Sequence, residues 1–437
     1  MIENTKLHIN EKEHLVIGEC DCVDLAKEFG TPLYVMDENA IRCNMRMYKN
    51  AMDKYYGDKG LVLYASKALC TMALCKIAEQ EGLGLDVVSG GELYTAQKAG
   101  FPMQKVYFHG NNKTQKELSE ALNAGIGRIV VDNDYELRLI NTLCGQKGIK
   151  AQISVRVKPG VDAHTHDFVK TGQIDSKFGV ALENGEVYEF VALAKSLPHV
   201  ELVGLHCHIG SQIFDLEPFE ETAKVMLDLI GNIKDDYGII ISELNLGGGF
   251  GIKYTNEDDP VEYDRYIESV SNVVKRLCEE IGIDQPFMLM EPGRSIVAPA
   301  GITLYTVGSV KDIKDIRKYV AVDGGMSDNP RYALYESKYT FMLANRAKAI
   351  KNQVVTVAGK CCESGDLLGK DIPMAEAEPG DLLAVLATGA YNYSMSMNYN
   401  RNGRPPMILV KDGRARVIVK GEDYEDIVRN DVIPGDL

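Results

Sequence analysis

The chain has 437 residues, an ordinary globular composition and a net charge of −15 near pH 7, so two domains are expected and a nucleic-acid-binding surface is not. Its ten cysteines are scattered without a Cys-x-x-Cys pair, which predicts a reduced, cytoplasmic protein with neither a disulfide framework nor a zinc site. The first ten residues lack a signal-peptide pattern, and the longest charge-free apolar stretch, 295–310, is too short and too interrupted to cross a membrane.

The first part of the chain opens with a short helical pattern at 24–29, a strand-like run at 32–36 and a helix over 39–56. Apolar strand-like runs then alternate with amphipathic helical patterns. Strands are predicted at 61–64, 84–88, 105–108, 128–131, 151–157, 200–206, 240–246 and 287–290. Helices are predicted at 68–81, 90–99, 114–123, 133–146, 183–196, 217–235 and 260–281.

Together with the helix at 39–56, these runs make eight strands and eight helices, which indicates a closed (β/α)8 barrel of the TIM type over 38–295. An open doubly wound sheet is the alternative, and it is disfavoured because no Gly-x-Gly-x-x-Gly opens the first strand–helix turn. For the last helix, Asp259 is expected to be the N-cap and Pro260 the first helical residue.

After residue 296 the runs become short and β-branched, and Gly and Asp interrupt them. Strands are predicted at 302–310, 318–323, 346–350, 353–358, 381–388, 407–410 and 414–419. This pattern is typical of a mostly antiparallel β domain. The strand near 32–36 precedes the barrel and can join that domain, so the second domain is expected to comprise 1–37 and 296–437.

Lys67 is predicted to lie where the first buried barrel strand ends and a helix begins. A sheltered but reachable amine loses its charge more easily, which suits Schiff-base chemistry, although a solvated boundary lysine is the ordinary alternative. Catalytic groups of such barrels lie at the carboxyl ends of the strands. Polar residues and glycines gather at those ends: Asp86, Ser89, His109, Arg156, His206, His208, Ser211, Gly247, Gly248, Gly249, Glu291, Gly293 and Arg294.

The triple glycine at 247–249 and the later Arg294 favour a phosphate site, because glycine lets backbone N–H groups approach an anion and arginine binds one bidentately. A tight turn is the alternative. Glu291 directly follows an apolar strand, so its carboxylate is expected to be partly buried and to need a cationic partner.

Two His-x-His pairs, 206/208 and 164/166, could ligate a metal because alternate strand residues share a face. The other strand ends offer no accompanying set of carboxylate and histidine in the sequence, so no metal site is predicted. Cys362 begins a Cys-Glu-Ser-Gly-Asp loop and could act as a general acid, although a cysteine more often packs in a core.

These motifs, in this order, resemble those of the fold-type III pyridoxal-phosphate-dependent decarboxylases from about Thr31 to the C-terminal region. The matching motifs are Tyr64-Ala-x-Lys67-Ala, Asp86-Val-x-Ser89-Gly-Gly-Glu, His109-Gly-Asn, His206-Cys-His208-Ile-Gly-Ser211-Gln, Gly247-Gly-Gly, Glu291-Pro-Gly-Arg294, Asp323-Gly-Gly-Met-x-Asp328-Asn-x-Arg331, Cys362-Glu-Ser-Gly-Asp and Gly389-Ala-Tyr391. Ser66 and the doubled Cys361-Cys362 vary within these motifs.

The resemblance implies a role for each residue. Lys67 would form the Schiff base with pyridoxal 5'-phosphate, Glu291 would keep the pyridine nitrogen protonated, and His208 would stack on the ring. Cys362, aligned by its Glu-Ser-Gly-Asp tail, would protonate the carbanion from the partner subunit, so the active unit would be a homodimer. The further cofactor contacts would be Asp86, Ser211, Gly248, Gly249, Gly293, Arg294 and Tyr391, and the substrate contacts Arg294, Arg331, Tyr335, Glu363 and Tyr391.

The implied reaction is decarboxylation of meso-2,6-diaminopimelate to L-lysine, the last step of lysine biosynthesis. An arginine and a glutamate suit the ammonium and carboxylate at the distal end of that substrate, although arginine, ornithine or carboxynorspermidine remain alternatives. A non-catalytic regulatory relative would be expected to lack Lys67 or Cys362, and both are present. A metal-dependent barrel hydrolase is the remaining alternative from a different class.

Overall fold

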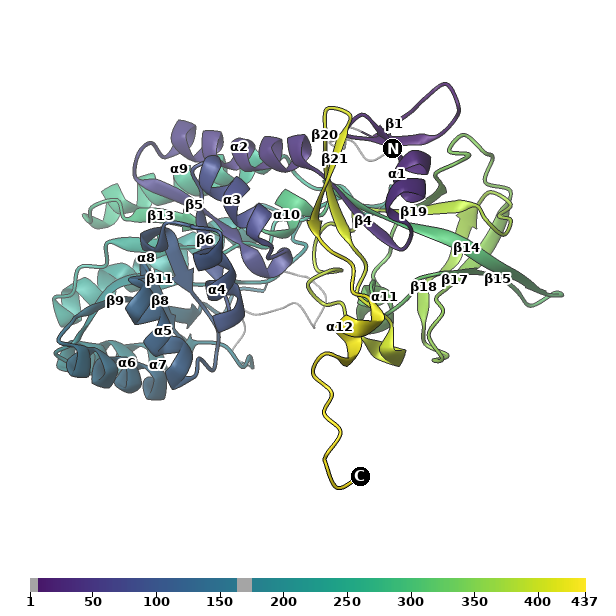
Figure 1. The fold of residues 1–437 in the computed structure, drawn as a ribbon. Helices are drawn as coiled ribbons and strands as arrows, with labels where there is room; N and C mark the ends of the chain where they lie inside the picture. Colours follow the sequence, from purple (N-terminus) through teal and green to yellow (C-terminus); the bar gives the residue numbers. More distant parts are fainter. Residues whose placement is uncertain (1–6, 163–174) are drawn as a thin grey trace. The chain divides into compact units, whose positions relative to one another are not determined.

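The computed structural model describes residues 7–162 and 175–437, so His164 and His166 lie outside the described residues. The chain divides into two compact units (Figure 1). A barrel unit comprises 43–252 and 259–295, and a β unit comprises 1–42, 253–258 and 296–437. Compared with the expected barrel limits of 38–295, the barrel unit begins at Cys43 and omits Lys253–Asp258.

Within the described residues, eight parallel strands of the barrel unit form a closed ring. They are β5 (Gly60–Ala65), β6 (Gly84–Val87), β7 (Val106–Phe108), β8 (Arg128–Val131), β9 (Ala151–Lys158), β11 (Val200–His206), β12 (Glu243–Asn245) and β13 (Phe287–Met290). Pairing of β8 with β9 closes the ring, with Val131 opposite Val155. This pairing confirms the barrel and excludes the open sheet.

Helices surround this ring of strands (Figure 1). They are α2 (Glu38–Tyr55), α3 (Met72–Gln80), α4 (Gly90–Lys98), α5 (Gln115–Ala124), α6 (Asp134–Lys147), α7 (Glu186–Ser196), α8 (Glu217–Tyr237) and α9 (Tyr263–Ile281). Hydroxyl and amide side chains begin several of them; Thr114, for example, forms a capping box with Glu117 at the start of α5. None of the helices within 7–162 and 175–437 is long and apolar enough to span a bilayer.

The predicted start of the last barrel helix is wrong. α9 begins at Tyr263 with Glu262 as its N-cap, rather than at Pro260. The chain before it forms a turn instead, because the Asp258 carboxylate accepts hydrogen bonds from the backbone N–H groups of Tyr254 and Thr255. Side chain–backbone bonds of this kind compete with helix formation.

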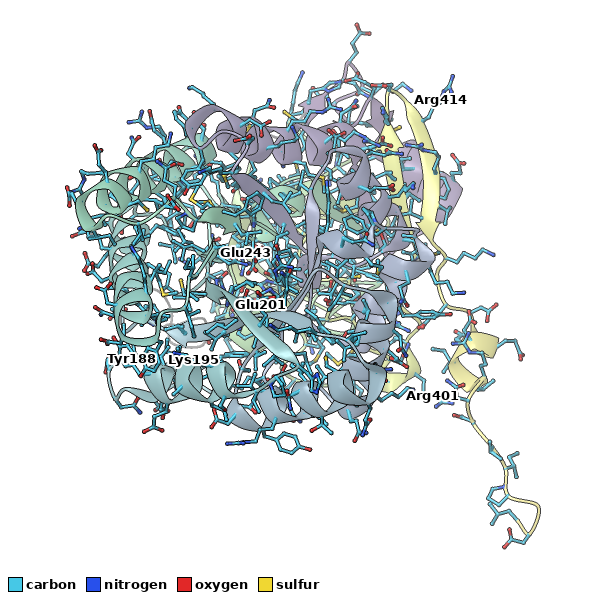
Figure 2. The ribbon with its side chains drawn as sticks, turned by 90° about the vertical axis from the view of Figure 1, so that its left-hand side faces the viewer. Tyr188, Lys195, Glu201, Glu243, Arg401 and Arg414 are labelled. Atoms are coloured by element: carbon cyan, nitrogen blue, oxygen red, sulfur yellow. The ribbon has the colours of Figure 1, made fainter. Side chains whose placement is uncertain are left out.

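The barrel interior contains both an apolar layer and a charged pair. Leu63, Tyr107, Val130 and Leu289 form a buried cluster inside the ring. At the amino ends of β8 and β12, the Arg128 guanidinium meets the Glu243 carboxylate with two contacts of 2.5 and 2.9 Å. Figure 2 shows Glu243 near the centre of the ring of helices. The carboxyl ends of the strands, at the opposite end of the barrel, therefore remain available for a site.

The β unit is a mostly antiparallel sheet in the order β18-β17-β15-β14-β4-β20-β21, with β19 and β16 branching from β14. Its strands are β4 (Leu33–Asp37), β14 (Gly301–Ile313), β15 (Arg317–Val322), β16 (Phe341–Leu343), β17 (Gln353–Ala358), β18 (Leu367–Met374), β19 (Leu382–Leu386), β20 (Met407–Lys411) and β21 (Arg414–Val419). β4 lies between β14 and β20, which confirms that the N-terminal strand joins this domain.

The remaining N-terminal elements of the β unit are short. β1 (His8–Ile9), β2 (Leu15–Ile17) and β3 (Cys20–Asp21) form a small sheet. α1 (Cys22–Phe29) ends at Phe29, as the helical pattern at 24–29 predicts, and Gly30 is its C-cap.

The predicted strands of the β unit differ from the structure at several places, and β1, β2, β3 and β16 are among the strands that were not predicted. The strand predicted at 346–350 is wrong, because β16 ends at Leu343 and Asn345 and Arg346 turn to bind the Asp381 carboxylate. The strand β18 was not predicted, since Gly369, two charged residues and Pro373 interrupt its pattern. β18 lies at an edge of the sheet, where proline is tolerated.

Candidate active site

The Lys67 turn packs against the turn that follows Glu291. β5 ends at Ala65 and a 3-10 turn, Ser66–Ala68, carries the half-buried Lys67. The backbone N–H of Ala65 donates to the carbonyl of Pro292 at 3.2 Å. A Cβ at Gly293 would lie 2.9 Å from the Ala65 side chain, so only glycine allows this close packing. The neighbouring pairing of β5 with β13 thus brings two motifs that are far apart in sequence to one place.

Buried polar groups surround the Glu291 carboxylate. Asn245, the last residue of β12, donates its side-chain N–H to Oε1 at 2.6 Å. The Nε2 atom of His109 lies 2.9 Å from the same oxygen, and the Nε2 atom of His206 lies 3.2 Å from Oε2. All four side chains are less than 9% exposed. Both carboxylate oxygens of Glu291 therefore have nearby polar groups. These groups come from the ends of three different strands.

This arrangement keeps Glu291 ionised. Burial alone would raise the pKa of the carboxyl, but His109 and His206 hold the pKa well below its usual range. Asp86 in β6 lies behind His109, with Oδ1 3.6 Å from Nε2, and burial raises the pKa of Asp86. The barrel mouth therefore contains an anionic carboxylate that is held in a fixed position.

The glycine segment lies directly beside Glu291. The backbone N–H of Glu291 donates to the carbonyl of Gly247 at 2.8 Å. A Cβ at Gly248 would lie 2.2 Å from the carbonyl oxygen of Glu291, so a side chain cannot fit there. Gly249 has φ +111° and an added Cβ would meet the Gly210 carbonyl at 2.4 Å. Backbone and packing therefore both require glycine in this segment.

Arg294 and His208 complete this end of the barrel. The Nη2 of Arg294 donates to Ser211 Oγ at 2.9 Å, which joins the two predicted phosphate-binding side chains. The backbone N–H of Gly248 donates to His208 Nδ1 at 3.4 Å. Burial, with Lys67 and Arg156 nearby, places the pKa of His208 well below its usual range, so this imidazole is neutral.

Three residues of this cluster were given no role from the sequence. His109 and His206 stand at strand ends in the sequence, but nothing in their spacing shows that both face Glu291. Asn245 has a weaker signal, since an asparagine before a glycine run usually indicates a turn. Only closure of the barrel identifies all three.

The expectation that no carboxylate–histidine set accompanies the His-x-His pair is wrong. Ligand atoms of His109, His206 and Glu291 all lie within 4.8 Å of one another. The contact of His206 at 3.2 Å is a hydrogen bond, and the 2.9 Å between His109 Nε2 and Glu291 Oε1 is an ion-pair distance, so these groups contact one another directly.

The β unit holds the predicted substrate residues Arg331, Tyr335 and Tyr391 together. Arg331 begins the short helix α11 (Arg331–Tyr335), and its guanidinium lies 5.5 Å from the ring centre of Tyr335 and 5.4 Å from that of Tyr391. Arg331 is 9% exposed, and its Nη2 donates to Ser337. Within the part of the chain that the structure describes, its Nε has no hydrogen-bond partner and no carboxylate pairs with this guanidinium. Arg331 is therefore a cation available to an anionic ligand.

The two neighbouring cysteines differ in exposure. Cys361 is buried, and burial together with Asp366 raises the pKa of its thiol. Cys362 is exposed, and its backbone N–H donates to Asn400 at 2.6 Å. The neighbouring Glu363 is also exposed and accepts a hydrogen bond from the backbone of Gly365. Of the two cysteines, Cys362 is therefore the exposed one.

Asp366 orders the loop that carries these cysteines. Its carboxylate accepts hydrogen bonds from the backbone N–H groups of Cys361 at 2.7 Å and Met326 at 2.6 Å. The Cys-Glu-Ser-Gly-Asp motif is thereby joined to the Asp323–Arg331 motif within the β unit.

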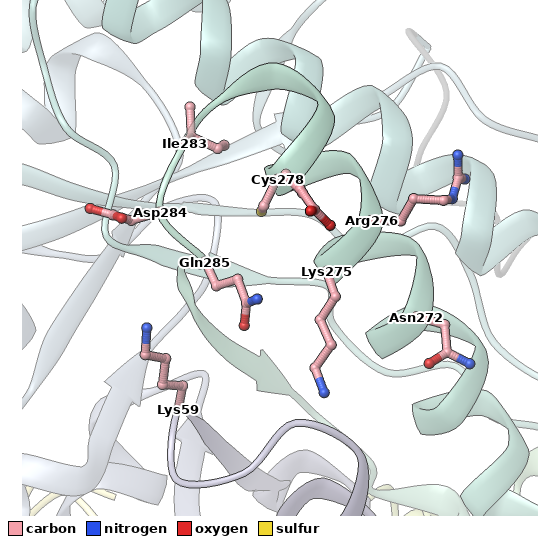
Figure 3. Close-up of a pocket in the computed structure, with 9 residues that line it drawn as sticks. Lys59, Asn272, Lys275, Arg276, Cys278, Ile283, Asp284 and Gln285 are labelled. Carbon is pink, nitrogen blue, oxygen red and sulfur yellow. The ribbon is translucent and has the colours of Figure 1, made fainter.

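A separate cavity of about 630 Å³ opens at the opposite end of the barrel (Figure 3). It lies beside α9 and the residues that precede β5 and β13, and its lining includes Lys59, Lys275, Arg276 and Asp284. None of the predicted site residues lines it.

Comparisons with known proteins give consistent results. Residues 38–298 match the family model described as pyridoxal-dependent decarboxylase, pyridoxal binding domain. The chain is 51% identical to the diaminopimelate decarboxylase of Bacillus methanolicus over 412 residues, which covers 94% of this chain and 95% of that protein. It is 50% identical to the enzyme of the same name from Bacillus subtilis strain 168, which covers 97% of this chain and 96% of that protein.

The fold is also similar to that of a solved structure. The crystal structure of the diaminopimelate decarboxylase of M. jannaschii in co-complex with L-lysine superposes with a TM-score of 0.93 and 36% identity. The superposition covers 100% of both chains.

Proposed function

Because the chain belongs to the pyridoxal-dependent decarboxylase family, we propose that it decarboxylates meso-2,6-diaminopimelate and releases L-lysine and carbon dioxide. The observation that carries the proposal is the ionised, hydrogen-bonded Glu291 at the barrel mouth that bears Lys67. The names of the two Bacillus relatives support the substrate, and the M. jannaschii structure holds L-lysine, which is the product of this reaction.

The residues at the barrel mouth fit pyridoxal 5'-phosphate. A protonated pyridine nitrogen needs a carboxylate, and Glu291 is held in that form. A phosphate needs convergent donors, which Ser211, Arg294 and the tightly packed glycines can supply. Lys67 supplies the amine for covalent attachment. We propose that Asp86, His208, Gly293 and Tyr391 complete the cofactor contacts.

Each group then has a separate task. When bound, the cofactor supplies the electron sink for loss of the α-carboxylate. Glu291 would keep the pyridine nitrogen protonated, and neutral His208 would lie against the ring without adding charge. Arg294 and Ser211 would hold the phosphate. Cys362 delivers a proton to the α-carbon, because it is the exposed thiol of the pair.

Arg331 carries the choice of substrate in this proposal. Its guanidinium has no acidic partner within the described residues, so it can bind the distal carboxylate of a diamino diacid. Glu363 would receive the distal ammonium, with Tyr335, Tyr391 and Arg294 as further contacts. Ornithine and arginine lack a distal carboxylate and would leave Arg331 without a partner.

We further propose a cytoplasmic homodimer in which Cys362 and Glu363 act in the site of the other subunit. The ten free cysteines suit a reducing compartment.

Release of carbon dioxide from a panel of amino acids tests the function. Purified enzyme loaded with pyridoxal 5'-phosphate is incubated with meso-diaminopimelate, L-lysine, L-ornithine, L-arginine and carboxynorspermidine. The proposal requires carbon dioxide from meso-diaminopimelate far above the others, with L-lysine as the product. Equal or greater rates with ornithine, arginine or carboxynorspermidine would assign the chain to one of the alternatives.

A further inference from the structure

The Glu291 carboxylate is surrounded more completely than a salt bridge to one cofactor atom requires. His109 and Asn245 contact Oε1, and His206 contacts Oε2. The two imidazole rings meet edge to face with centres 4.7 Å apart. His206 is the last residue of β11 and is 1% exposed, so its ring has a fixed position.

The hydrogen on His206 can be assigned from its contacts. Burial lowers the pKa of this imidazole to about 4, so the ring is neutral near pH 7. Its Nε2 faces the carboxylate, whereas Nδ1 has no hydrogen-bond partner within residues 7–162 and 175–437. A carboxylate only accepts, so the hydrogen lies on Nε2 and His206 donates to Glu291.

We propose that His206 is a positioning residue that keeps Glu291 ionised and correctly oriented for the pyridine nitrogen of the cofactor. A buried carboxylate without donors takes up a proton. A protonated Glu291 would present its own O–H and could not hold a proton on the pyridine nitrogen. The inference therefore rests on the proposed function and adds a residue that acts through Glu291.

A neutral donor suits this task better than a cation. His206 stabilises the carboxylate by one hydrogen bond and adds no full positive charge that would repel a protonated pyridine. Other charged or titratable groups already act on this carboxylate or on its neighbours. They are Lys67, Asp86, Tyr107, His109, Arg156, Cys207 and His208.

The test compares two substitutions of His206. His206→Leu removes the donor at similar size, and His206→Gln keeps an N–H donor. His8→Leu removes an exposed histidine of the β unit and serves as the control. Each apoprotein is titrated with pyridoxal 5'-phosphate, and the 15N shift of ring-labelled cofactor is followed between about pH 6 and pH 9 in the loaded proteins.

The expected result distinguishes the effect of losing the N–H donor from the effect of losing the imidazole ring of His206. Wild type, His8→Leu and His206→Gln keep the pyridine nitrogen protonated throughout. His206→Leu loses that proton within the range and binds the cofactor about 10- to 100-fold more weakly, the usual effect of removing a hydrogen bond to a charged group. Should the leucine variant fail to fold, His206→Met removes the donor with a flexible side chain and the same comparison applies.

Two results would overturn the inference: unchanged affinity and protonation in the apolar variant, or an equal loss in the glutamine variant. Absence of cofactor binding by the wild type would instead contradict the proposed function, so the two failures are distinguishable.

Discussion

Asn245 bonds to Glu291 and to the glycine segment at the same time. Its side-chain N–H donates to Glu291 Oε1 at 2.6 Å, and its side-chain oxygen accepts the backbone N–H of Gly247 at 2.9 Å. One buried amide thus fixes the carboxylate relative to the glycines proposed to hold phosphate. An amide side chain can make both bonds because it offers a donor and an acceptor.

Replacing Asn245 should therefore weaken cofactor binding. Asn245→Leu leaves one donor fewer on a buried carboxylate, which costs about 1.5–3 kcal/mol, or roughly 10- to 100-fold in affinity. Titration of the apoprotein measures this loss. Asn123→Leu is the control, because Asn123 is exposed. Its side-chain oxygen accepts a hydrogen bond from the Lys147 ammonium. An affinity equal to that of the wild type would remove the assigned role.

Lys67→Ala should abolish covalent attachment of the cofactor. Borohydride reduction of the loaded protein followed by peptide mass spectrometry should find the pyridoxyl group on Lys67 in the wild type and on no lysine in the variant. Lys59→Ala is the matched control. Lys59 precedes β5 and so lies at the other end of this strand from Lys67. Labelling of another lysine in the variant would contradict the assignment.

The two cysteines should respond differently to substitution. Cys362→Ala should leave cofactor binding intact and lower kcat by about 10²- to 10⁴-fold, the usual contribution of a general acid. Cys361→Ala should retain most activity. It should lower the thermal stability instead, because the Cys361 thiol is buried beside Asp366. Steady-state rates and thermal unfolding distinguish the two. A greater loss of kcat in the Cys361 variant would reverse the assignment.

The shared dimer site predicts complementation between inactive variants. Lys67→Ala and Cys362→Ala are mixed, unfolded and refolded together. If each site takes Lys67 from one subunit and Cys362 from the other, half of the dimers have one intact site and activity should return to about a quarter of the wild-type value. Continued inactivity of properly refolded mixtures would place both residues in one chain.

Arg331→Met should change substrate choice rather than cofactor binding. Loss of a charged bond to the distal carboxylate predicts a KM for meso-diaminopimelate about 10- to 100-fold higher and a smaller preference over ornithine. Arg414→Met in β21 is the control, since this arginine is exposed (Figure 2) and it is Arg331 whose guanidinium lies over the Tyr335 and Tyr391 rings. Unchanged kinetics would remove Arg331 from the substrate contacts.

Asp328 should make the stability of the β unit depend on pH. Burial raises the pKa of its carboxyl to about 7, although Tyr305 donates to Oδ1 and Gly325 to Oδ2. The folded state binds the proton more tightly than the unfolded state, so the free energy of unfolding falls as pH rises from about 4 to 7, by up to about 4 kcal/mol. Urea unfolding at several pH values measures this slope. In Asp328→Asn the slope should be smaller, and an unaltered slope would assign the dependence to other groups.

The limits of several barrel strands were predicted closely from the sequence alone, because each strand is a distinct run of apolar residues. β8, β11 and β13 have the predicted limits, since each is a buried run that polar residues terminate. The predictions fail where a side-chain bond holds the backbone in a turn that the apolar pattern does not indicate. Asp258 forms such a bond before α9, and Asp381 forms one with Arg346. The edge strand β18 lacks a periodic signal because Gly369, two charged residues and Pro373 interrupt it.

For this protein, the sequence by itself determined the barrel, the β domain with its N-terminal strand, and the candidate roles of Lys67, Glu291 and Arg294, because hydrophobic period and local motifs are properties of neighbouring residues. Only the tertiary structure decided that His109, His206 and Asn245 converge on Glu291, and that Cys362 rather than Cys361 is exposed. The reason is that barrel closure and strand register bring the ends of β7, β11, β12 and β13 together across long stretches of chain.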